Sequence, residues 1–159
     1  MTSSDLRDYA TVVAATVALL VFIVNSFSLL RNRRIDNLAR YFEAHQRLFE
    51  PDGYMAGNIG AIEAGTLVRD QSDDEMEAKF HLMLLEIEQL AILANNHAVP
   101  RHTQVYMLGS YTRQVLQALT EQERSSMFWE LAIGYLEGLA KDTAQYETLT
   151  RKQREAFWR

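Results

Sequence analysis

Few side chains in this 159-residue sequence have the types and spacing that catalysis requires. The chain has no cysteine and therefore no thiol nucleophile, and neither a G-x-S-x-G nor an H-E-x-x-H motif occurs. A Glu-x-x-His pair of the kind found in di-iron bundles is also absent. Of the four histidines, His97 and His102 lie five residues apart across Pro100, so they do not share a regular helical face. From these residues we predict no catalytic set, no cofactor and no metal site.

The segment RYFEAH contains Arg40 and His45, which are separated by four residues. This spacing resembles the R-x4–6-H motif of the HEPN ribonuclease superfamily, with Tyr41 where that motif usually has Asn, Asp or His. The resemblance implies RNA cleavage at a dimer interface, with histidine as acid or base and arginine stabilising phosphate charge. Arg40 and His45 are therefore nuclease candidates under one of three hypotheses for this chain.

Two carboxylates, Glu86 and Glu88, lie in the most apolar part of the second half of the chain. Because they are two residues apart, they point to different sides of a helix and make a poor carboxylate pair. One of them should face apolar surroundings, where a carboxylate needs a partner such as Arg113.

The elements that must position these residues begin with an uncharged segment at 9–30. At about 1.5 Å per residue, 22 residues span roughly 33 Å, close to the thickness of the hydrocarbon core of a bilayer. The preceding residues 1–8 lack the basic character of a signal peptide, and no small-residue cleavage site follows. We therefore predict an uncleaved transmembrane helix at 9–30, after an extracytoplasmic tail at 1–8.

Arg31, Arg33 and Arg34 follow this segment directly, whereas residues 1–8 carry a net charge of −1. Positive charge beside a membrane span stays on the cytoplasmic side, so we expect the N-terminus outside and the rest of the chain in the cytoplasm. The same arginines suit contact with lipid headgroups. The lack of cysteine and the low content of Pro and Gly lead us to expect a bacterial inner (cytoplasmic) membrane.

The helix should continue past the arginines as a juxtamembrane helix at 31–50. Apolar residues and one histidine recur there with helical spacing. They are Ile35, Leu38, Phe42, His45 and Phe49. The segment Glu50-Pro51-Asp52-Gly53 should end this helix, because Pro disfavours helical geometry in the residue before it and Gly permits a turn.

Residues 51–159 read as a cytoplasmic bundle of four or five helices, so the predicted fold class is all-α. We expect a short helix at 54–68, followed by a core helix that starts with a Ser72–Glu75 capping box and ends at Asn95-Asn96. The next helix should begin at Pro100, and Thr120 and Glu123 should form a second capping box. The predicted core positions of the three long helices are Met76, Phe80, Met83, Leu84, Ile87, Leu90, Ala91 and Ala94; then Val105, Leu108, Tyr111, Val115 and Leu119; then Phe128, Leu131, Ala132, Tyr135, Leu139 and Tyr146.

Charge is distributed unevenly. Residues 35–150 carry 8 basic and 18 acidic side chains, a net charge of −10, and the last nine residues carry +3. An acidic body repels phosphate backbones, so nucleic acid is not expected as a partner. The basic, aromatic end RKQREAFWR suits either a frayed helix or contact with a membrane surface.

The order of these elements, with the segments LLEIEQLAILANNHAV and YMLGSYTRQVL, resembles a bacterial family of single-span membrane proteins of unknown function. The architecture is also similar to the membrane accessory proteins of type VI-B CRISPR loci. Those proteins have one N-terminal span and a cytoplasmic helical domain with a divergent HEPN motif, and they assemble into a ring-like pore. The resemblance implies a role in stress or phage defence.

Within the span, Ala10, Ala14 and Ala18 have small-xxx-small spacing, and Asn25 lies near its cytoplasmic end. Small residues let helix backbones approach closely, and an amide in lipid seeks a partner on another helix. We add Ile35, Leu38 and Phe42 to this predicted helix–helix interface. Three hypotheses follow: a membrane-anchored oligomer or scaffold that includes a pore as one form, an accessory subunit of a larger membrane complex, and a divergent HEPN-type ribonuclease. We expect the first and no enzyme activity, with the lipid bilayer and further copies or a membrane complex as partners.

Overall fold

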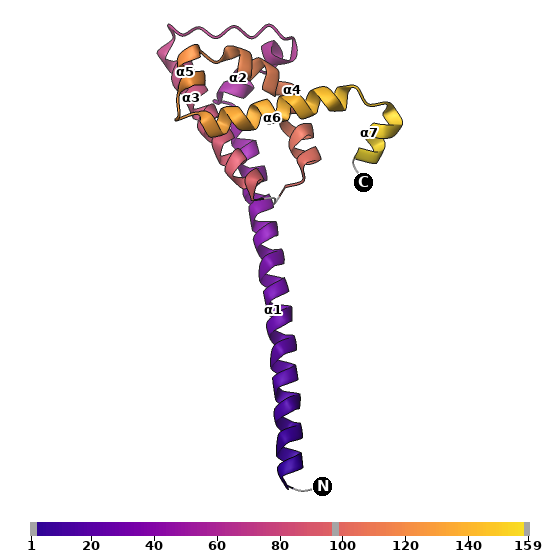
Figure 1. Cartoon of the computed structure of the whole chain (residues 1–159). Coiled ribbons are helices and arrows are strands. Elements are labelled where there is room, and N and C mark those ends of the chain that lie inside the picture. The colour runs from indigo at the N-terminus through magenta and orange to yellow at the C-terminus, as the bar shows by residue number, and fades with distance from the viewer. Residues whose placement is uncertain (1–2, 97–98, 158–159) are drawn as a thin grey trace. The chain divides into compact units, whose positions relative to one another are not determined.

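The computed structural model describes residues 3–96 and 99–157, without the side chains of residues 3–12, 14, 15 and 157. All regular elements in this part of the chain are helices, which confirms the all-α class (Figure 1). The helices are α1 (Ser3–Leu48), α2 (Tyr54–Glu63), α3 (Asp74–Asn95), α4 (Arg101–Ala118), α5 (Glu121–Ser125), α6 (Glu130–Glu147) and α7 (Arg151–Phe157).

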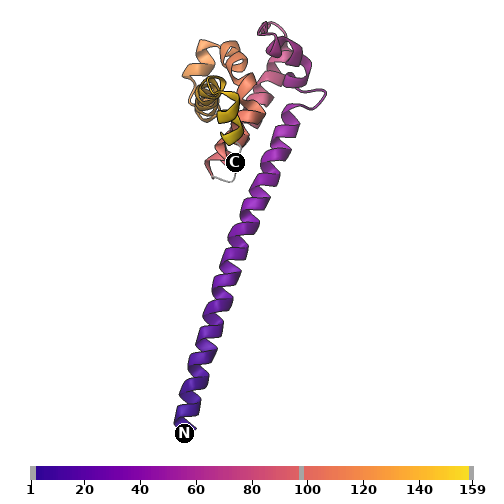
Figure 2. The same cartoon turned by 90° about the vertical axis from the view of Figure 1, so that its right-hand side faces the viewer.

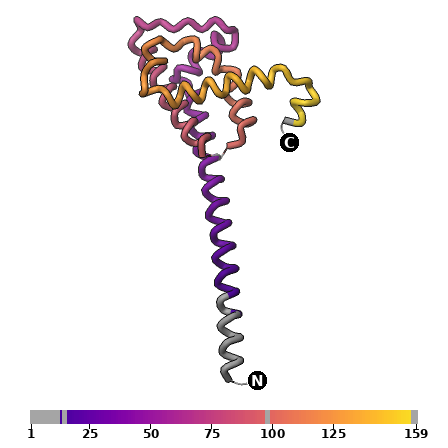
Figure 3. Tube along the Cα trace, in the orientation of Figure 1, coloured from indigo at the N-terminus to yellow at the C-terminus, as the bar shows by residue number. Residues whose placement is uncertain are grey.

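Helix α1 is continuous through the arginines, as predicted, and ends just before the Pro51 turn (Figure 3). In that turn the Gly53 amide donates to the Glu50 carbonyl at 2.8 Å. The chain divides into two compact units, residues 1–36 and residues 37–159, so the last turns of α1 belong to the second unit.

The first unit is the part of α1 that carries the uncharged segment. Its large apolar side chains from Val17 to Leu30 are exposed in the single chain. Among the residues that the structure describes, no helix is both long and apolar enough to cross a membrane.

In the second unit, α1 buries a face different from the predicted stripe. Tyr41, Ala44 and Leu48 are buried. Phe42 is exposed, whereas Leu38 and Phe49 are only partly buried against the core. The sequence did not indicate this second face, because spacing alone does not distinguish two adjacent helical faces when Tyr and Ala also supply apolar surface.

Helix α2 ends at Glu63, five residues before the predicted end at 68. Gly65 has a φ of +68°, a left-handed conformation that terminates a helix, and its amide donates to the Ile62 carbonyl at 3.1 Å. The prediction of a helix to 68 was wrong because Gly65 serves as the stop signal.

Helix α3 contributes seven buried residues to the core. All of its predicted core positions from Phe80 to Ala94 are buried, and Met76 packs partly against them. The predicted Ser72–Glu75 capping box is wrong, because Asp73 is the N-cap and accepts from the backbone amides of Glu75 and Met76. The Ser72 hydroxyl instead donates to Asp70 at 2.6 Å.

Helix α6 packs against both α3 and α4, and Figure 2 views it nearly end on. The close approach of α4 requires Gly109, since a Cβ atom there would clash with the Thr143 hydroxyl. Most predicted core positions of α4 and α6 are buried or partly buried. Phe128 is an exception: it precedes α6 and is 74% exposed, so its prediction as a core residue was wrong.

Candidate functional site

Arg69 is the centre of a compact group of charged residues. Its side chain is only 4% exposed although it lies between α2 and α3. The guanidinium donates to both carboxylate oxygens of Glu77 at 2.5 Å and to both of Glu123 at 2.8 Å. It also donates to the Ala118 carbonyl at 3.1 Å and lies 3.7 Å from the centre of the Phe80 ring. One cation therefore ties together the 64–73 loop, α3, the end of α4 and α5.

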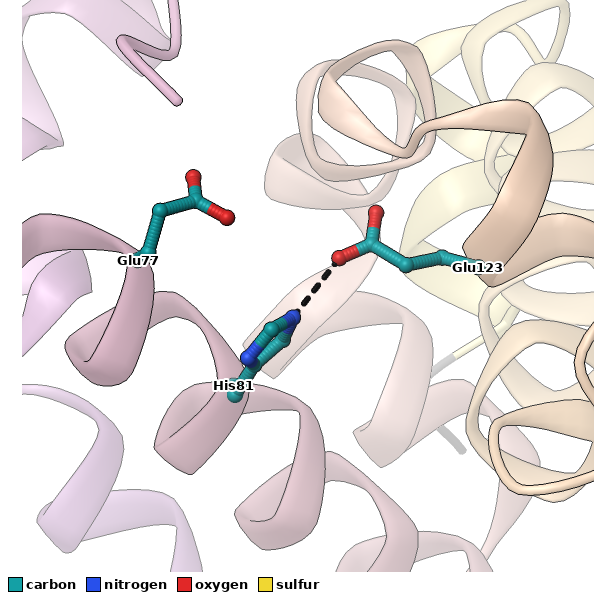
Figure 4. A group of neighbouring side chains, drawn as sticks. All are labelled: Glu77, His81 and Glu123. Carbon is teal, nitrogen blue, oxygen red and sulfur yellow. Dashed lines mark hydrogen bonds and ion pairs between the residues drawn. The ribbon is translucent and has the colours of Figure 1, made fainter. Parts of the chain in front are cut away.

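His81 completes this cluster from α3, one turn after Glu77. Figure 4 shows both side chains facing Glu123 of α5, and the His81 Nε2 atom lies 2.8 Å from a Glu123 carboxylate oxygen. The imidazole stacks on Trp129, with ring centres 5.6 Å apart. These residues line a cavity of about 350 Å³.

Glu123 is held in place by its own helix as well as by Arg69. The predicted capping box is confirmed: the Thr120 backbone amide donates to the Glu123 carboxylate at 2.8 Å, and the Thr120 hydroxyl accepts from the Glu123 amide at 3.1 Å. Burial alone would raise the pKa of Glu123, but the hydrogen bonds from Arg69, Thr120 and His81 outweigh it and hold that pKa at about 2. The two carboxylates in turn raise the pKa of Arg69 despite its burial.

Glu77, His81 and Glu123 could supply ligand atoms for a metal ion, because these atoms all lie within 4.8 Å of one another. However, the Arg69 guanidinium already binds both carboxylates, so a metal ion would have to displace a buried cation. A carboxylate with a pKa of about 2 is also a weak base at neutral pH. The arrangement suits a structural ion-pair cluster that fixes α5 against α3.

The two nuclease candidates have different surroundings. Arg40 is exposed, whereas His45 is half-buried beside Phe49, and its Nε2–H donates to the Met107 carbonyl at 3.3 Å. Burial lowers the pKa of His45, although the bond to Met107 opposes this shift. Ribonuclease activity through Arg40 and His45 stays a prediction that an RNA-cleavage assay of the full chain can test.

Glu86 forms an ion pair, but its partner is Arg47 rather than the predicted Arg113. Arg47 of α1 donates to Glu86 through Nε at 3.0 Å and also to Gln89 at 2.9 Å. Arg113 instead lies 3.8 Å from Glu147 of α6, so the prediction of Arg113 as the partner was wrong. Glu86 lies on α3 and Arg113 on α4, and the sequence pattern did not predict how these helices dock.

The predicted interface residues of the span are described only in part. The side chains of Ala10 and Ala14 lie outside the described residues, whereas Ala18 and Asn25 are exposed. Arg31, Arg33 and Arg34 are exposed, as headgroup contact requires. Ile35 and Phe42 are also exposed, which leaves both side chains accessible to another chain.

A second cavity, of about 500 Å³, lies between α3 and α6. Glu88, Glu130 and Arg101 line it together with the exposed Met127. Arg101 donates to Asp142 at 2.6 Å and to Gln104 at 3.0 Å, so its cationic group joins α4 to α6.

Sequence reasoning missed the Arg69 cluster as a unit. The capping box of Thr120 and Glu123 was found because its residues are three apart, a spacing that a local pattern reveals. The partners of Arg69 are 8 and 54 residues away, and no local pattern connects them. An arginine alone in a loop between two apolar helices was the only signal available.

Comparison with known proteins adds no relative: no family model, no curated protein and no solved structure matches this chain.

Proposed function

We propose that this protein is a membrane-anchored scaffold that works through helix–helix association. The observation that carries the proposal is the uncharged segment at 9–30, which is continuous in α1 with a folded helical bundle. Eleven large apolar side chains between residues 13 and 30 are exposed in the isolated chain. They are Val13, Val17, Leu19, Leu20, Val21, Phe22, Ile23, Val24, Phe27, Leu29 and Leu30.

Exposure of so many apolar side chains in water is costly. Burial of apolar surface contributes roughly 25 cal/mol per Å², or about 1.5–3 kcal/mol for a large side chain. Lipid acyl chains can cover all sides of such a helix, whereas a soluble protein partner covers only the face that it contacts. Because the helix satisfies its own backbone hydrogen bonds, it can enter the hydrocarbon region without exposing polar groups.

The charges beside this segment favour one orientation. Arg31, Arg33 and Arg34 follow the segment and would remain on the cytoplasmic side, which puts the bundle in the cytoplasm. Their exposed side chains can contact anionic lipid headgroups.

Association is the part of the proposal that follows from the span itself. Ala10, Ala14 and Ala18 would let two spans approach closely, and Asn25 could bond across the pair. Anchoring concentrates the chains in two dimensions, so contacts that are weak in solution gain from a higher effective concentration.

Membrane association can be tested with the full chain expressed in bacteria and a matched pair of variants. We expect the wild-type chain to stay with membranes through alkaline carbonate washing and to need detergent for release. The double variant Leu20→Arg, Val24→Arg should shift to the soluble or aggregated fraction, since an arginine at a helix centre costs about 2.5–3.5 kcal/mol on insertion scales. The control Val68→Arg alters an 86%-exposed apolar residue outside the segment and should fractionate like the wild type.

A wild-type chain recovered in the soluble fraction without detergent would overturn the membrane proposal. The mass of the full chain in mild detergent then tests association. A discrete homo-oligomer supports a scaffold of identical copies. A monomer that co-purifies with one fixed partner would instead support the accessory-subunit hypothesis.

A further inference from the structure

Helix α3 carries a second regular stripe, on the side opposite the core. Six exposed residues follow one another at spacings of four and three. They are Ala78, Leu82, Leu85, Gln89 and Ile92, followed by the C-cap residue Asn96. Three of them are large apolar side chains with substantial exposure, namely Leu82 at 61%, Leu85 at 38% and Ile92 at 50%.

This spacing is the heptad pattern of a coiled coil. With Leu82, Gln89 and Asn96 at a positions, Ala78, Leu85 and Ile92 fall at d positions. At 1.5 Å per residue, the stripe is about 27 Å long. An ordinary surface helix needs only one apolar face, which α3 already uses in the core, so the second face is unexplained by the fold of the bundle.

We infer that this stripe, which we call the α3 seam, pairs with the same seam of a second copy of the chain, parallel and in register. In such a pair, each residue at heptad position a faces the same residue of the partner chain. Gln89 would meet the partner's Gln89, so that each buried amide has a hydrogen-bonding group opposite it. Oε1 of Gln89 accepts from Arg47 and retains a second lone pair for the partner's amide N–H.

An antiparallel pair fits less well. In an antiparallel pair, residues at position a lie opposite residues at position d. Gln89 would then face an apolar side chain such as Leu85, and its amide would be desolvated without a partner. A polar residue at an a position is a common device for selecting one register in this way.

The flanking charges are compatible with the parallel pair. Asp74 and Lys79 lie at the g and e positions that approach each other between parallel chains, and their charges are opposite. Lys79 also pairs with Glu75 of its own helix at 2.8 Å. The Glu86 charge is already compensated by Arg47, and Glu88 would face Leu93. Glu75, at the a position that precedes the seam, would face its own counterpart, and Lys79 compensates its charge.

The seam spans fewer than three heptads, so we expect the contact to be weak between free chains. The inference therefore rests on the proposed function, in which membrane anchoring raises the local concentration of the chains. A second copy at the seam would add an interface outside the bilayer to the one proposed within the span.

Thiol cross-linking tests this inference cleanly, because the chain has no cysteine of its own. Full-length chains with Leu85→Cys or Ile92→Cys are treated in membranes with a short bifunctional thiol reagent. We expect both d positions to give a cross-linked homodimer at about tenfold the yield of Gln117→Cys, since thiols held at a contact react at a high effective concentration. Gln117 is an exposed position on α4.

A second variant shows whether the contact depends on the seam. Adding Leu82→Lys places like charges opposite each other and should return the Leu85→Cys yield to that of Gln117→Cys, whereas adding Gln117→Lys should leave it unchanged. Yields at 85 and 92 no higher than at 117, a yield unaffected by Leu82→Lys, or cross-linking only to a different protein would overturn the inference. The proposed function fails separately, if the wild-type chain is absent from the membrane fraction.

Discussion

At the scale of single residues, Arg69 is a buried cation that is paired with two carboxylates of the fold. Its five N–H groups are distributed over Glu77, Glu123 and the Ala118 carbonyl, so each of them has an acceptor. Removing one member would leave an uncompensated buried charge, which costs about 3–5 kcal/mol in comparable pairs. The cluster should therefore matter for stability and for its pH dependence.

The pKa of Glu123, lowered from 4.5 to about 2, predicts the pH range in which this stability is lost. A carboxylate whose folded pKa is lowered contributes its full stability above the unfolded pKa and loses it as the pH falls through the folded value. We expect the free energy of unfolding to fall between about pH 4.5 and pH 2, with Glu123 contributing at most about 3 kcal/mol of the change.

Urea unfolding of the full chain in detergent, followed by circular dichroism at several pH values, measures this effect. Glu123→Gln should be less stable than the wild type at pH 7, and the difference should vanish near pH 2. Glu121→Gln, an exposed change on the same helix, should follow the wild type throughout. A Glu123→Gln difference that stays constant with pH would contradict the assigned pKa.

At the scale of elements, the bundle depends on close packing of α4 and α6. Gly109 permits this approach, and the Thr143 hydroxyl beside it donates to the Leu139 carbonyl at 2.8 Å. Tyr41 of α1 and Tyr135 of α6 add a buried contact between their hydroxyl groups at 2.9 Å. Contacts of this kind determine which faces of the helices meet.

Gly109→Ala should therefore destabilise the bundle although alanine favours helices. The added methyl group must displace Thr143, and overpacking of this kind costs about 1–3 kcal/mol. Ser110→Ala changes the exposed neighbour on α4 and serves as the control, since it should be neutral or slightly stabilising. Thermal unfolding of the three chains measures the difference, and a Gly109→Ala chain as stable as the wild type would contradict the packing argument.

At the scale of the whole molecule, the proposals concern a tether and a folded interaction unit on one chain. The bundle is acidic, and the arginines that follow the uncharged segment are basic. Anionic headgroups would attract the arginines and repel the bundle. This division of charge is consistent with a bundle that contacts other proteins rather than the membrane surface.

The proposed orientation predicts which residues a membrane-impermeant thiol reagent can reach. In intact bacterial cells with a permeabilised outer membrane, Ser4→Cys should be labelled and Gln117→Cys should not. Gln117→Cys should become reactive only after the inner membrane is disrupted. Labelling of Gln117→Cys in intact cells would reverse the orientation, since positive charge would then lie on the outer side of the span.

Local sequence patterns predicted much of the helical structure and little of what joins the helices. The core face of α3 followed from its 3.6-residue period, and the cap of α5 followed from Thr120 and Glu123, because both signals lie within a few turns of chain. The prediction that Arg113 pairs with one of the two glutamates was wrong, and no sequence pattern revealed the Arg69 cluster. Those pairs depend on how distant helices dock.

The sequence by itself determined the uncharged segment, the arginines that follow it, several helix ends and the all-α class. Each of these depends on interactions between residues that are close along the chain. Only the tertiary structure decided that Tyr41, Ala44 and Leu48 are the buried face of α1, that Arg69 joins two distant carboxylates, and that the α3 seam is left exposed. Several apolar faces were available to the chain, and the docking of the helices selected which of them became core and which became surface.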